Sequence, residues 1–411
     1  MKLFDELQWR GSIANISSPD LIDKLNEGGL TFYVGTDPTA DSLHIGHYSF
    51  MVIAERLKRA GHKPIILVGG ATGLIGDPKP NAERPMISKE QLQNNYEMMQ
   101  KQVKRLHDFE TVNNYDWSKD INFIDYLRDY GKYFSINYML AKETVKARLD
   151  TGITYTEFSY MILQALDFLY LYENNNCVLQ MGGQDQWGNI TSGIELIRRK
   201  IGKEAYGFTY PLITKKDGSK FGKTESGTLW LDKNKTSSYE LYQYFINVED
   251  EMVINYLKTY TFLNKEEIEL LEKSLKENPH LREAHKVLAS EVVKQIHGQE
   301  ELDKALKITE ILFSGDIKSL NKEELEIAFK DVPSFEFNLD SLLVNVLIEG
   351  SIATSKREAR EFIESGSISL NGDKVTDLDF IINKDILINQ ELLVIRKGKK
   401  KYYLGKTKKE I

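Results

Sequence analysis

Only one cysteine, Cys177, occurs in the 411 residues of this chain, so an internal disulfide is excluded. It lies in the apolar stretch CVLQM, which indicates a buried structural thiol in a reducing compartment. No run of about 18 apolar residues occurs, which excludes a helix that spans a bilayer. The N-terminal MKLFDELQWRGSI lacks the apolar core of a signal peptide and predicts a short amphipathic helix. We therefore expect a cytoplasmic protein with no membrane partner.

The chain also has fewer basic than acidic residues. Its formal net charge is −7, and this alone argues against a nucleic-acid-binding protein. The distribution changes that interpretation: residues 396–411 carry eight Lys or Arg and one acid, Glu410. An acidic body with a basic end can bind a polyanion locally. The alternative is a solvated tail.

The remaining composition, 41% hydrophobic and 28% charged, is typical of a globular protein of two or three domains. Between about Leu30 and Thr214, short apolar runs alternate with helical periods. The runs are LTFYVG, KPIILVGG, CVLQMGG and YGFTYPLIT. Their alternation with helices predicts a doubly wound, Rossmann-like α/β domain over residues 1–230, with a parallel sheet and ligands at the carboxyl ends of its strands.

Three further regions follow from the pattern. Residues from about 80 to 156 are helical and rich in Tyr, Met and Phe, which predicts an insertion that forms a subunit interface. An all-helical domain is predicted over residues 231–330. The sequence NKEE, at Asn264 and again at Asn321, has the pattern of a capping box that starts a helix, and apolar residues recur at helical spacing. Residues 331–340 are expected to be a linker, and residues 341–411 to form a small α+β domain.

The stretch FYVGTDPTADSLHIGH places His44 and His47 one helical turn apart behind a strand and a Gly-bearing turn. A metal site would need further ligands, but the chain has one cysteine and only seven histidines. A helix start that happens to hold two imidazoles is the second interpretation. The third is a phosphate cradle, because a helix beginning near Leu43 offers unpaired N–H groups and Gly46 lets a ligand approach closely.

A second loop, KKDGSKFGKTESG, carries Lys220, Lys223 and Thr224 directly after the last predicted strand. It is either a solvated turn or a flexible clamp for a triphosphate at the same edge of the sheet as the histidines. Phosphoryl chemistry depends on positioning and charge stabilisation, which suits mobile lysines.

HIGH and KFGKT resemble the two signature motifs of class I aminoacyl-tRNA synthetases. The wider match of YVGTDPTADSLHIGH, GGATGLIGDP, TEFSYMILQALDF, GGQDQWGNI and KFGKTESGTLWLD is similar to tyrosyl-tRNA synthetases of the bacterial type. SKREAREFIESGSISLNGDKV resembles an S4-type RNA-binding module, which implies an S4-like domain over residues 341–411 and favours RNA binding by the basic end.

The resemblance implies a tyrosine pocket. Tyr33 and Asp167 would bind the phenol hydroxyl, Asp77, Tyr160 and Gln164 the amino group, and Gln186 would position the carboxyl group and α-phosphate. Such partners would reject phenylalanine, because it leaves them unpaired. Tyr160, Gln164 and Asp167 also fall at i, i+4 and i+7, so a helix presents them on one stripe.

The resemblance also implies an ATP site. The residues around ATP would be Gly35, Asp37, Thr39, His44, His47, Gly183 and Asp185, with Lys220, Lys223 and Thr224 over the pyrophosphate. Arg84 would reach it from another loop. This loop departs from the family, because DPKPNAER replaces a longer form with a Gly-Lys-Lys segment, and Lys79 is the candidate substitute. Mg²⁺ would accompany ATP, and no separate metal site is expected.

The implied activity is tyrosine–tRNA ligation: tyrosine and ATP form tyrosyl-adenylate and pyrophosphate, and the tyrosyl group passes to the terminal adenosine of tRNA(Tyr). The family also implies a homodimer joined through the insertion. Small adenylyltransferases lack the helical and RNA-binding domains, and tryptophanyl-tRNA synthetases need no phenol partner. The rival from another class is an RNA-binding protein on a catalytically retired scaffold.

Overall fold

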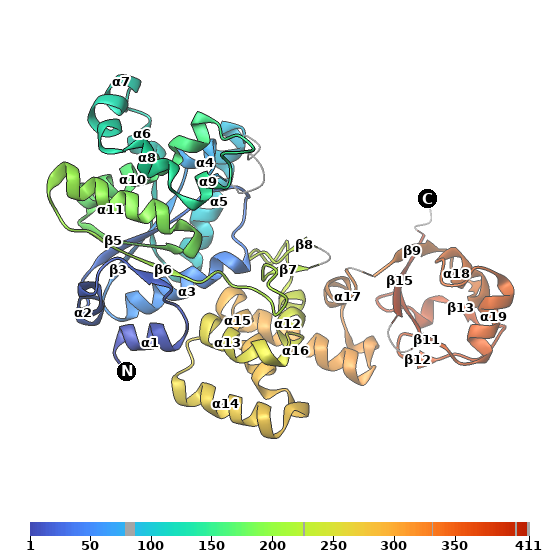
Figure 1. Ribbon diagram of the computed structural model, residues 1–411. Coiled ribbons are helices and arrows are strands. Elements are labelled where there is room, and N and C mark those ends of the chain that lie inside the picture. Colours follow the sequence, from blue (N-terminus) through green and yellow to red (C-terminus); the bar gives the residue numbers. More distant parts are fainter. Residues whose placement is uncertain (79–86, 225–226, 331, 399–400, 409–411) are drawn as a thin grey trace. The chain divides into compact units, whose positions relative to one another are not determined.

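The computed structural model describes residues 1–78, 87–224, 227–330, 332–398 and 401–408 (Figure 1). Arg84 and Lys79, with residues 399–400 and 409–411 of the basic end, lie outside the described residues. The chain forms two compact units. The first comprises Met1–Thr236 with Tyr244–Ile296, and the second Ser237–Gln243 with His297–Ile411. Among the described helices, none combines the length and apolar character needed to cross a membrane.

The first unit is built on a six-stranded sheet with strand order β1-β6-β5-β2-β3-β4. The strands are β1 (Asn15–Ile16), β2 (Thr31–Thr36), β3 (Lys63–Val68), β4 (Glu110–Asn113), β5 (Cys177–Gly183) and β6 (Tyr206–Tyr210). The four predicted apolar runs contain β2, β3, β5 and β6, which pair in parallel as expected. The predicted doubly wound α/β fold is therefore confirmed. Two short strands were not predicted: β1, which is antiparallel to β6, and β4.

The order of the strands places a topological switch point beside β2. The chain leaves β2 for β3 on one side and returns to pair β5 with the other side. Ligands of open α/β sheets bind at the carboxyl ends of the strands next to such a point. The helices of this region are α1 (Leu3–Trp9), α2 (Asp20–Glu27), α3 (Ile45–Arg59), α4 (Thr72–Ile75), α5 (Lys89–His107), α10 (Tyr155–Asn175) and α11 (Trp187–Ile201).

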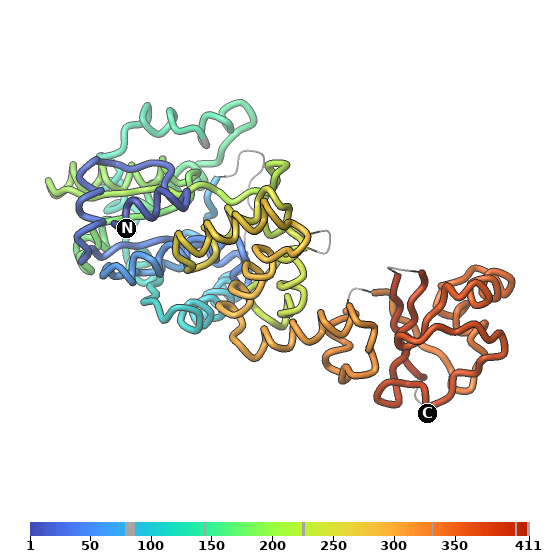
Figure 2. Tube along the Cα trace, turned by 90° about the horizontal axis from the view of Figure 1, so that it is seen from below, coloured from blue at the N-terminus to red at the C-terminus, as the bar shows by residue number. Residues whose placement is uncertain are grey.

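The insertion begins later than residue 80. Helix α5 and strand β4 belong to the sheet architecture, because β4 pairs with β3, and its half-buried sequence ETVN carried no apolar run that would predict a strand. The segment after β4 consists of short elements: α6 (Tyr115–Ser118), α7 (Phe123–Asp125), a π-helix (Tyr126–Tyr130), a 3₁₀ turn (Gly131–Tyr133), α8 (Ile136–Leu140) and α9 (Glu143–Lys146). These elements lie together at one end of the first unit (Figures 1 and 2).

Helices replace strands after Trp230, as predicted. They are α12 (Ser238–Ile246), α13 (Asp250–Tyr260), α14 (Lys265–Glu277), α15 (Glu283–His297), α16 (Gln299–Ser314) and α17 (Lys322–Ala328). Both predicted capping boxes are present: Asn264 pairs reciprocally with Glu267, and Asn321 with Glu324. The expected domain 231–330 is divided, however, because α13 to α15 belong to the first unit and α16 and α17 to the second.

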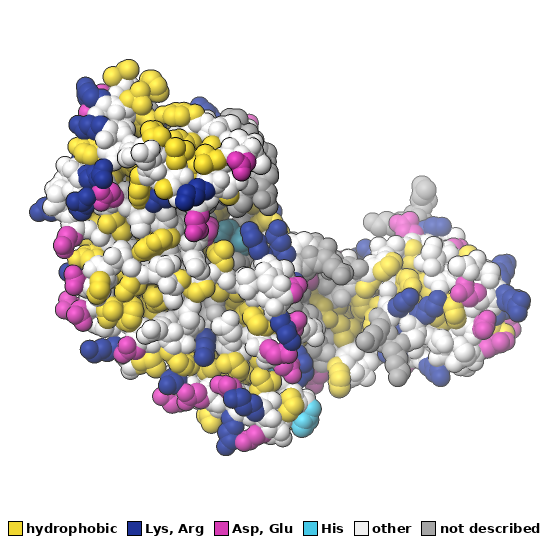
Figure 3. Space-filling model, in the orientation of Figure 1, with side chains coloured by type: hydrophobic (Ala, Val, Ile, Leu, Met, Phe, Trp, Pro, Cys, Tyr) yellow, Lys and Arg dark blue, Asp and Glu magenta, His cyan; other side chains and the backbone are white. Residues whose placement is uncertain are grey.

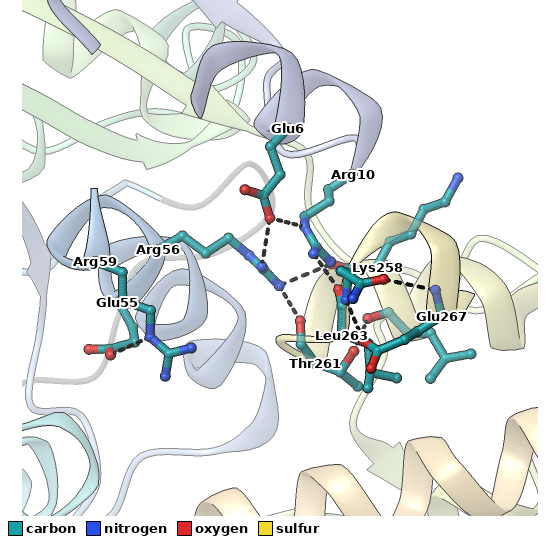
Figure 4. Close-up of polar contacts among 11 residues, drawn as sticks. Glu6, Arg10, Glu55, Arg56, Arg59, Lys258, Thr261, Leu263 and Glu267 are labelled. Carbon is teal, nitrogen blue, oxygen red and sulfur yellow. Dashed lines mark hydrogen bonds and ion pairs between the residues drawn. The ribbon is translucent and has the colours of Figure 1, made fainter. Parts of the chain in front are cut away.

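A buried arginine ties three elements of the first unit together (Figure 4). Arg56 of α3 donates to Glu6 of α1 at 3.2 Å, to the carbonyl oxygen of Lys258 at 3.4 Å and to that of Thr261. Arg10 of α1 donates to the carbonyl oxygens of Lys258 and Leu263. The carbonyl groups left open at the end of α13 therefore find their donors on α1 and α3.

The second unit holds the small α+β fold. A five-stranded sheet, in the order β12-β11-β14-β15-β9, packs with two helices. The elements are β9 (Ser334–Phe337), β10 (Ser341–Leu342), α18 (Leu343–Glu349), α19 (Lys356–Glu364), β11 (Ile368–Leu370), β12 (Asp373–Lys374), β13 (Ile381–Ile382), β14 (Leu392–Lys397) and β15 (Lys401–Thr407). The predicted linker 331–340 thus contains a strand, because Phe335 and Phe337 alternate toward the core and β9 pairs with β15.

Candidate active site

A cavity of about 530 Å³ opens at the carboxyl edge of the sheet, between β2 and β5. Most residues implied by the resemblance line it: Tyr33, Gly35, Asp37, Thr39, His44, His47, Asp77, Tyr160, Gln164, Asp167, Gly183, Asp185, Gln186 and Lys220. Lys223 is exposed and outside this lining, and Thr224 lies in the short strand β7 (Lys223–Thr224). The fold therefore gathers residues from β2, α3, α10, β5 and the lysine loop at one place.

The two histidines begin helix α3 by capping each other. His44 is the N-cap residue, and its Nδ1 accepts the backbone N–H of His47 at 3.4 Å. The Nδ1 of His47 accepts the backbone N–H of His44 at 3.3 Å. The rings stack with centroids 3.7 Å apart. The helix begins at Ile45, two residues later than predicted, and both imidazoles serve as caps in addition to facing the cavity.

This capping determines what the imidazoles can donate. A ring nitrogen that accepts a hydrogen bond carries no proton, so the proton of each neutral ring sits on Nε2. Burial lowers the pKa of His47 to about 3, and electrostatic repulsion between the two imidazoles adds to the effect. Burial also lowers the pKa of His44, assisted by the charges of Lys220 and Lys223. Both rings are therefore neutral N–H donors near pH 7, which suits an anion and not a metal ion.

The metal interpretation has no further support among the described residues, because they contain no group of three or more His, Cys, Asp or Glu placed to hold a metal ion. The predicted helix start is present, and it is compatible with the predicted phosphate cradle: the caps satisfy backbone N–H groups through Nδ1 and leave Nε2–H free to donate. Gly46 is required here, because an ideal Cβ at this position would lie 2.9 Å from Cε1 of His44.

Asp167 lines the cavity and is 2% exposed. Its two carboxylate oxygens accept hydrogen bonds of 2.9 Å from Asn114 Nδ2 and Trp117 Nε1. Burial raises the pKa of Asp167 to about 7, although the two donors oppose the shift. Asn114 and Trp117 belong to the start of the insertion, and neither was predicted, because the sequence separates them from Asp167 by 53 and 50 positions.

Two buried polar atoms near Asp167 have no hydrogen-bond partner among the described residues: the hydroxyl of Tyr33 and Oε1 of Gln180. These residues face each other in register on β2 and β5, and both line the cavity. Buried polar groups without partners are uncommon, and at a cavity wall they are candidates for hydrogen bonds to a ligand. Gln180 was not predicted, although a glutamine within the apolar run CVLQMGG was a visible signal.

Two further aspartates, Asp37 and Asp77, line the cavity. Asp37 accepts hydrogen bonds from the hydroxyls of Tyr160 at 3.0 Å and Thr72 at 2.8 Å. Asp77 accepts from the side-chain amides of Gln186 at 2.8 Å and Asn189 at 3.4 Å. Asn189 also donates to Oε1 of Gln164 at 3.0 Å, so one amide joins residues from three segments of the chain. Thr72 and Asn189 were not predicted.

The lysine loop is joined to the start of α3 by backbone contacts. The N–H of Leu229 donates to the carbonyl oxygen of Gly222 at 3.0 Å, and the N–H of Ile45 donates to that of Leu229 at 2.9 Å. Lys220 lines the cavity. The loop therefore lies at the same edge of the sheet as the histidines, as predicted, and is more than a solvated turn.

The chain is similar to known proteins over nearly its whole length. The family described as tRNA synthetases class I (W and Y) matches residues 25–314, and the SYY-like C-terminal domain of tyrosine–tRNA ligase matches residues 324–405. The tyrosine–tRNA ligase of Geobacillus stearothermophilus is 53% identical and aligns with 98% of this chain and 99% of its own length. That of Staphylococcus carnosus strain TM300 is 50% identical, with 99% of both chains covered.

Solved structures show the same relationship. A C-terminally truncated mitochondrial tyrosyl-tRNA synthetase of Aspergillus nidulans superposes with a TM-score of 0.68 at 31% identity, covering 76% of this chain and 94% of that chain. The tyrosyl-tRNA synthetase of Archaeoglobus fulgidus complexed with L-tyrosine has a TM-score of 0.56 at 16% identity, covering 74% of this chain and all of that chain, and shows the fold alone.

Proposed function

This chain belongs to the class I tRNA synthetases of the tryptophan and tyrosine type and acts as a tyrosine–tRNA ligase in protein biosynthesis, and we propose that the cavity between β2 and β5 is where it activates tyrosine. The observation that carries this assignment is the pair Tyr33 and Asp167. A buried phenol without a partner and a buried carboxyl group lie together in the cavity.

The phenol hydroxyl of the substrate would donate to Asp167 and accept from Tyr33. Asn114 and Trp117 hold the Asp167 carboxylate in place by one hydrogen bond to each oxygen. Phenylalanine in the same position would leave the Tyr33 hydroxyl without a partner and would give Asp167 no third donor, and a buried polar group without its partner is costly. Selectivity thus follows from hydrogen bonds that only tyrosine completes.

The other end of the amino acid would meet a second group of polar residues that line the cavity. Asp77, Tyr160 and Gln164 would bind the α-amino group, and Gln186 would orient the carboxylate toward ATP. The amide of Asn189 bonds to Asp77 and to Gln164, so it keeps these acceptors at a fixed spacing.

Adenylation joins a carboxylate oxygen of tyrosine to the α-phosphorus of ATP, while the bond from that phosphorus to the pyrophosphate oxygen breaks. Negative charge shifts to the transferred and leaving phosphates in the transition state. The Nε2–H groups of His44 and His47, with the hydroxyl of Thr39, would donate to these oxygens, and Lys220, Lys223 and Thr224 would stabilise the leaving pyrophosphate. Arg84, outside the described residues, is proposed for the same task.

The other ATP contacts are assigned to Gly35, Asp37, Gly183 and Asp185, which line the cavity around the start of α3. Mg²⁺ would arrive with ATP, bound chiefly by its phosphates, because Mg²⁺ commonly uses substrate phosphates with one or two carboxylates. Its charge would neutralise phosphate oxygens and leave the protein's lysines to hold the pyrophosphate.

The second step transfers the tyrosyl group from the adenylate to a ribose hydroxyl of the terminal adenosine of tRNA(Tyr), and AMP leaves. We assign RNA binding to the second unit, where Lys356, Arg357 and Arg360 lie exposed on α19. RNA binding through such cations is salt-dependent. The site of action would be the cytoplasm, where charged tRNA is used.

A homodimer through the insertion is proposed from its surface. The exposed large apolar residues of this region are Tyr115, Phe123, Ile124, Leu127, Ile136, Tyr138, Leu149 and Tyr155. Figure 3 shows apolar side chains gathered over this end of the first unit. A contiguous apolar surface of this kind is typical of a protein interface, and a second copy of the chain is the proposed occupant.

The test is tyrosine-dependent exchange of pyrophosphate into ATP, without tRNA, with phenylalanine and tryptophan as controls. Exchange with tyrosine alone supports the adenylation site and its phenol pocket. Exchange with none of the three amino acids would contradict the proposal and return the retired, RNA-binding scaffold to consideration.

A further inference from the structure

The lysine loop is anchored by aromatic residues that the proposed chemistry does not use. Phe221, between the two lysines of the loop, is 6% exposed. Its ring centroid lies 5.2 Å from that of Tyr244, 4.2 Å from that of Tyr256 and 5.6 Å from that of Tyr260. These rings come from the end of α12 and from α13. The loop is therefore held by helices that follow the catalytic sheet in the sequence.

Gly222 is the point where this anchorage meets the start of α3. Its N–H donates to the hydroxyl of Tyr244 at 3.1 Å, and its carbonyl oxygen accepts the N–H of Leu229 at 3.0 Å. Its φ is +84°, and an ideal Cβ would lie 2.2 Å from Cγ2 of Ile45, the residue after His44. Glycine is thus required twice, for the backbone conformation and for the close approach.

The segment that enters the loop has a matching anchor. The hydroxyl of Tyr256 donates to the carbonyl oxygen of Thr214 at 2.9 Å, and Thr214 pairs with Lys220 across the loop. One phenol therefore fixes the strand that enters the loop, and Tyr244 fixes the strand that leaves it. The two anchors differ in what they hold. The Tyr244 hydroxyl accepts from Gly222, which directly precedes Lys223 and lies directly against Ile45 of α3.

We propose that Tyr244 is a positioning residue for adenylation: its hydroxyl fixes Gly222 against Ile45 and thereby sets where Lys220 and Lys223 stand relative to His44 and His47. This inference rests on the proposed function, because it concerns the geometry of that site. Tyr244 lies outside both signature motifs, so the motif pattern does not mark it as a catalytic residue. It acts through the backbone of Gly222. A displacement of about 1 Å in a catalytic group can cost about 100-fold in rate.

The test uses Tyr244→Phe, which keeps the ring against Phe221 and removes only the acceptor of the Gly222 N–H. The matched control is Tyr206→Phe, which removes a phenol bonded to Glu204 at the amino end of β6, away from the cavity. Rapid mixing with tyrosine and Mg-ATP gives the adenylation rate constant, and equilibrium titration gives the dissociation constant of tyrosine. We expect the rate constant of Tyr244→Phe to fall about 10- to 100-fold with an unchanged dissociation constant, and neither to change in Tyr206→Phe.

A double-mutant cycle separates positioning from general destabilisation. If Tyr244 acts through the lysine loop, Tyr244→Phe adds little to the loss already caused by the double variant Lys220→Ala/Lys223→Ala, because the groups it positions are gone. Additive losses, or a rate constant equal to that of the unmodified chain, would overturn the inference. Absence of tyrosine-dependent adenylation in the unmodified chain would instead contradict the proposed function, so the two failures are distinguishable.

Discussion

His44 and His47 cap the same helix end reciprocally, with Nδ1 of each ring accepting the backbone N–H of the other at 3.4 and 3.3 Å. Each ring thus carries its proton on Nε2 and serves both the helix and the ligand site. The two roles can be separated, because asparagine also caps helices well but has no donor that reaches as far as Nε2.

His44→Asn is expected to keep the helix cap and to lose the donor to phosphate. The free energy of unfolding should stay within about 0.5 kcal/mol of its original value, whereas His44→Ala should lose about 1 kcal/mol. Both variants should lower the adenylation rate constant by about 100- to 1000-fold, the scale for removing one transition-state donor. Urea unfolding and pre-steady-state kinetics measure the two effects. Weaker tyrosine binding with an unchanged rate constant would contradict the donor role.

Asp167→Asn is expected to weaken discrimination between tyrosine and phenylalanine. A hydrogen bond to a charged group contributes about 1.5–3 kcal/mol, so the ratio of kcat/KM for the two amino acids should fall about 10- to 100-fold. The measurement is pyrophosphate exchange with each amino acid in turn. Unchanged selectivity would show that another residue recognises the phenol hydroxyl.

Tyrosine binding should depend on pH through the same carboxyl group. The pKa of Asp167 is raised to about 7, so the fraction that is ionised increases as the pH rises from 6 to 8. The carboxylate accepts the phenol proton, and the dissociation constant of tyrosine should therefore fall about tenfold over this range. Titration of Asp167→Asn provides the reference, because its side chain cannot ionise. The same pH dependence in both proteins would assign the effect to another group.

His107 should make the fold sensitive to acid. Its ring lies between those of Tyr48 and Phe109, and burial lowers its pKa to about 4. The unfolded chain binds this proton below about pH 6.5, whereas the folded chain binds it only near pH 4, so stability decreases as the pH falls through that interval. One such group lowers the free energy of unfolding by about 2 kcal/mol between pH 7 and pH 5.

The test of this sensitivity is urea unfolding of the original chain and of His107→Phe at pH 7 and pH 5. Phenylalanine keeps an aromatic ring in the stack and does not titrate. The decrease on acidification should be smaller in the variant by about 2 kcal/mol. An equal decrease in both proteins would mean that other groups account for the acid sensitivity.

Arg56→Met should destabilise the first unit. It removes the donors to Glu6 and to the carbonyl oxygens of Lys258 and Thr261. Arg10 still donates to Glu6 and to the Lys258 carbonyl oxygen, so the carbonyl group of Thr261 is the one that loses its arginine donor. One such group predicts a loss of about 2 kcal/mol in the free energy of unfolding. The control is Arg59→Met, whose side chain is 56% exposed, with an expected loss of less than about 1 kcal/mol. Equal losses would show that the Arg56 contacts are not important for stability.

Local patterns predicted much of this protein. The parallel strands were visible as short apolar runs, and Asn264 and Asn321 marked helix starts that the structure confirms, because a capping box involves residues only three apart. The short strands β1, β4 and β9 were missed, because two to four residues carry too little periodicity and their pairing partners lie far away in the sequence.

The sequence by itself determined the class of fold, the helix start that holds His44 and His47, and the residue types of the candidate site. The tertiary structure alone decided that Asn114 and Trp117 support Asp167, that Gln180 faces Tyr33, and that Tyr244 holds Gly222. The physical reason is distance along the chain. A cap or an apolar stripe is encoded within one or two helical turns, whereas a hydrogen bond between residues 22 or 53 positions apart exists only after the elements that carry them have packed.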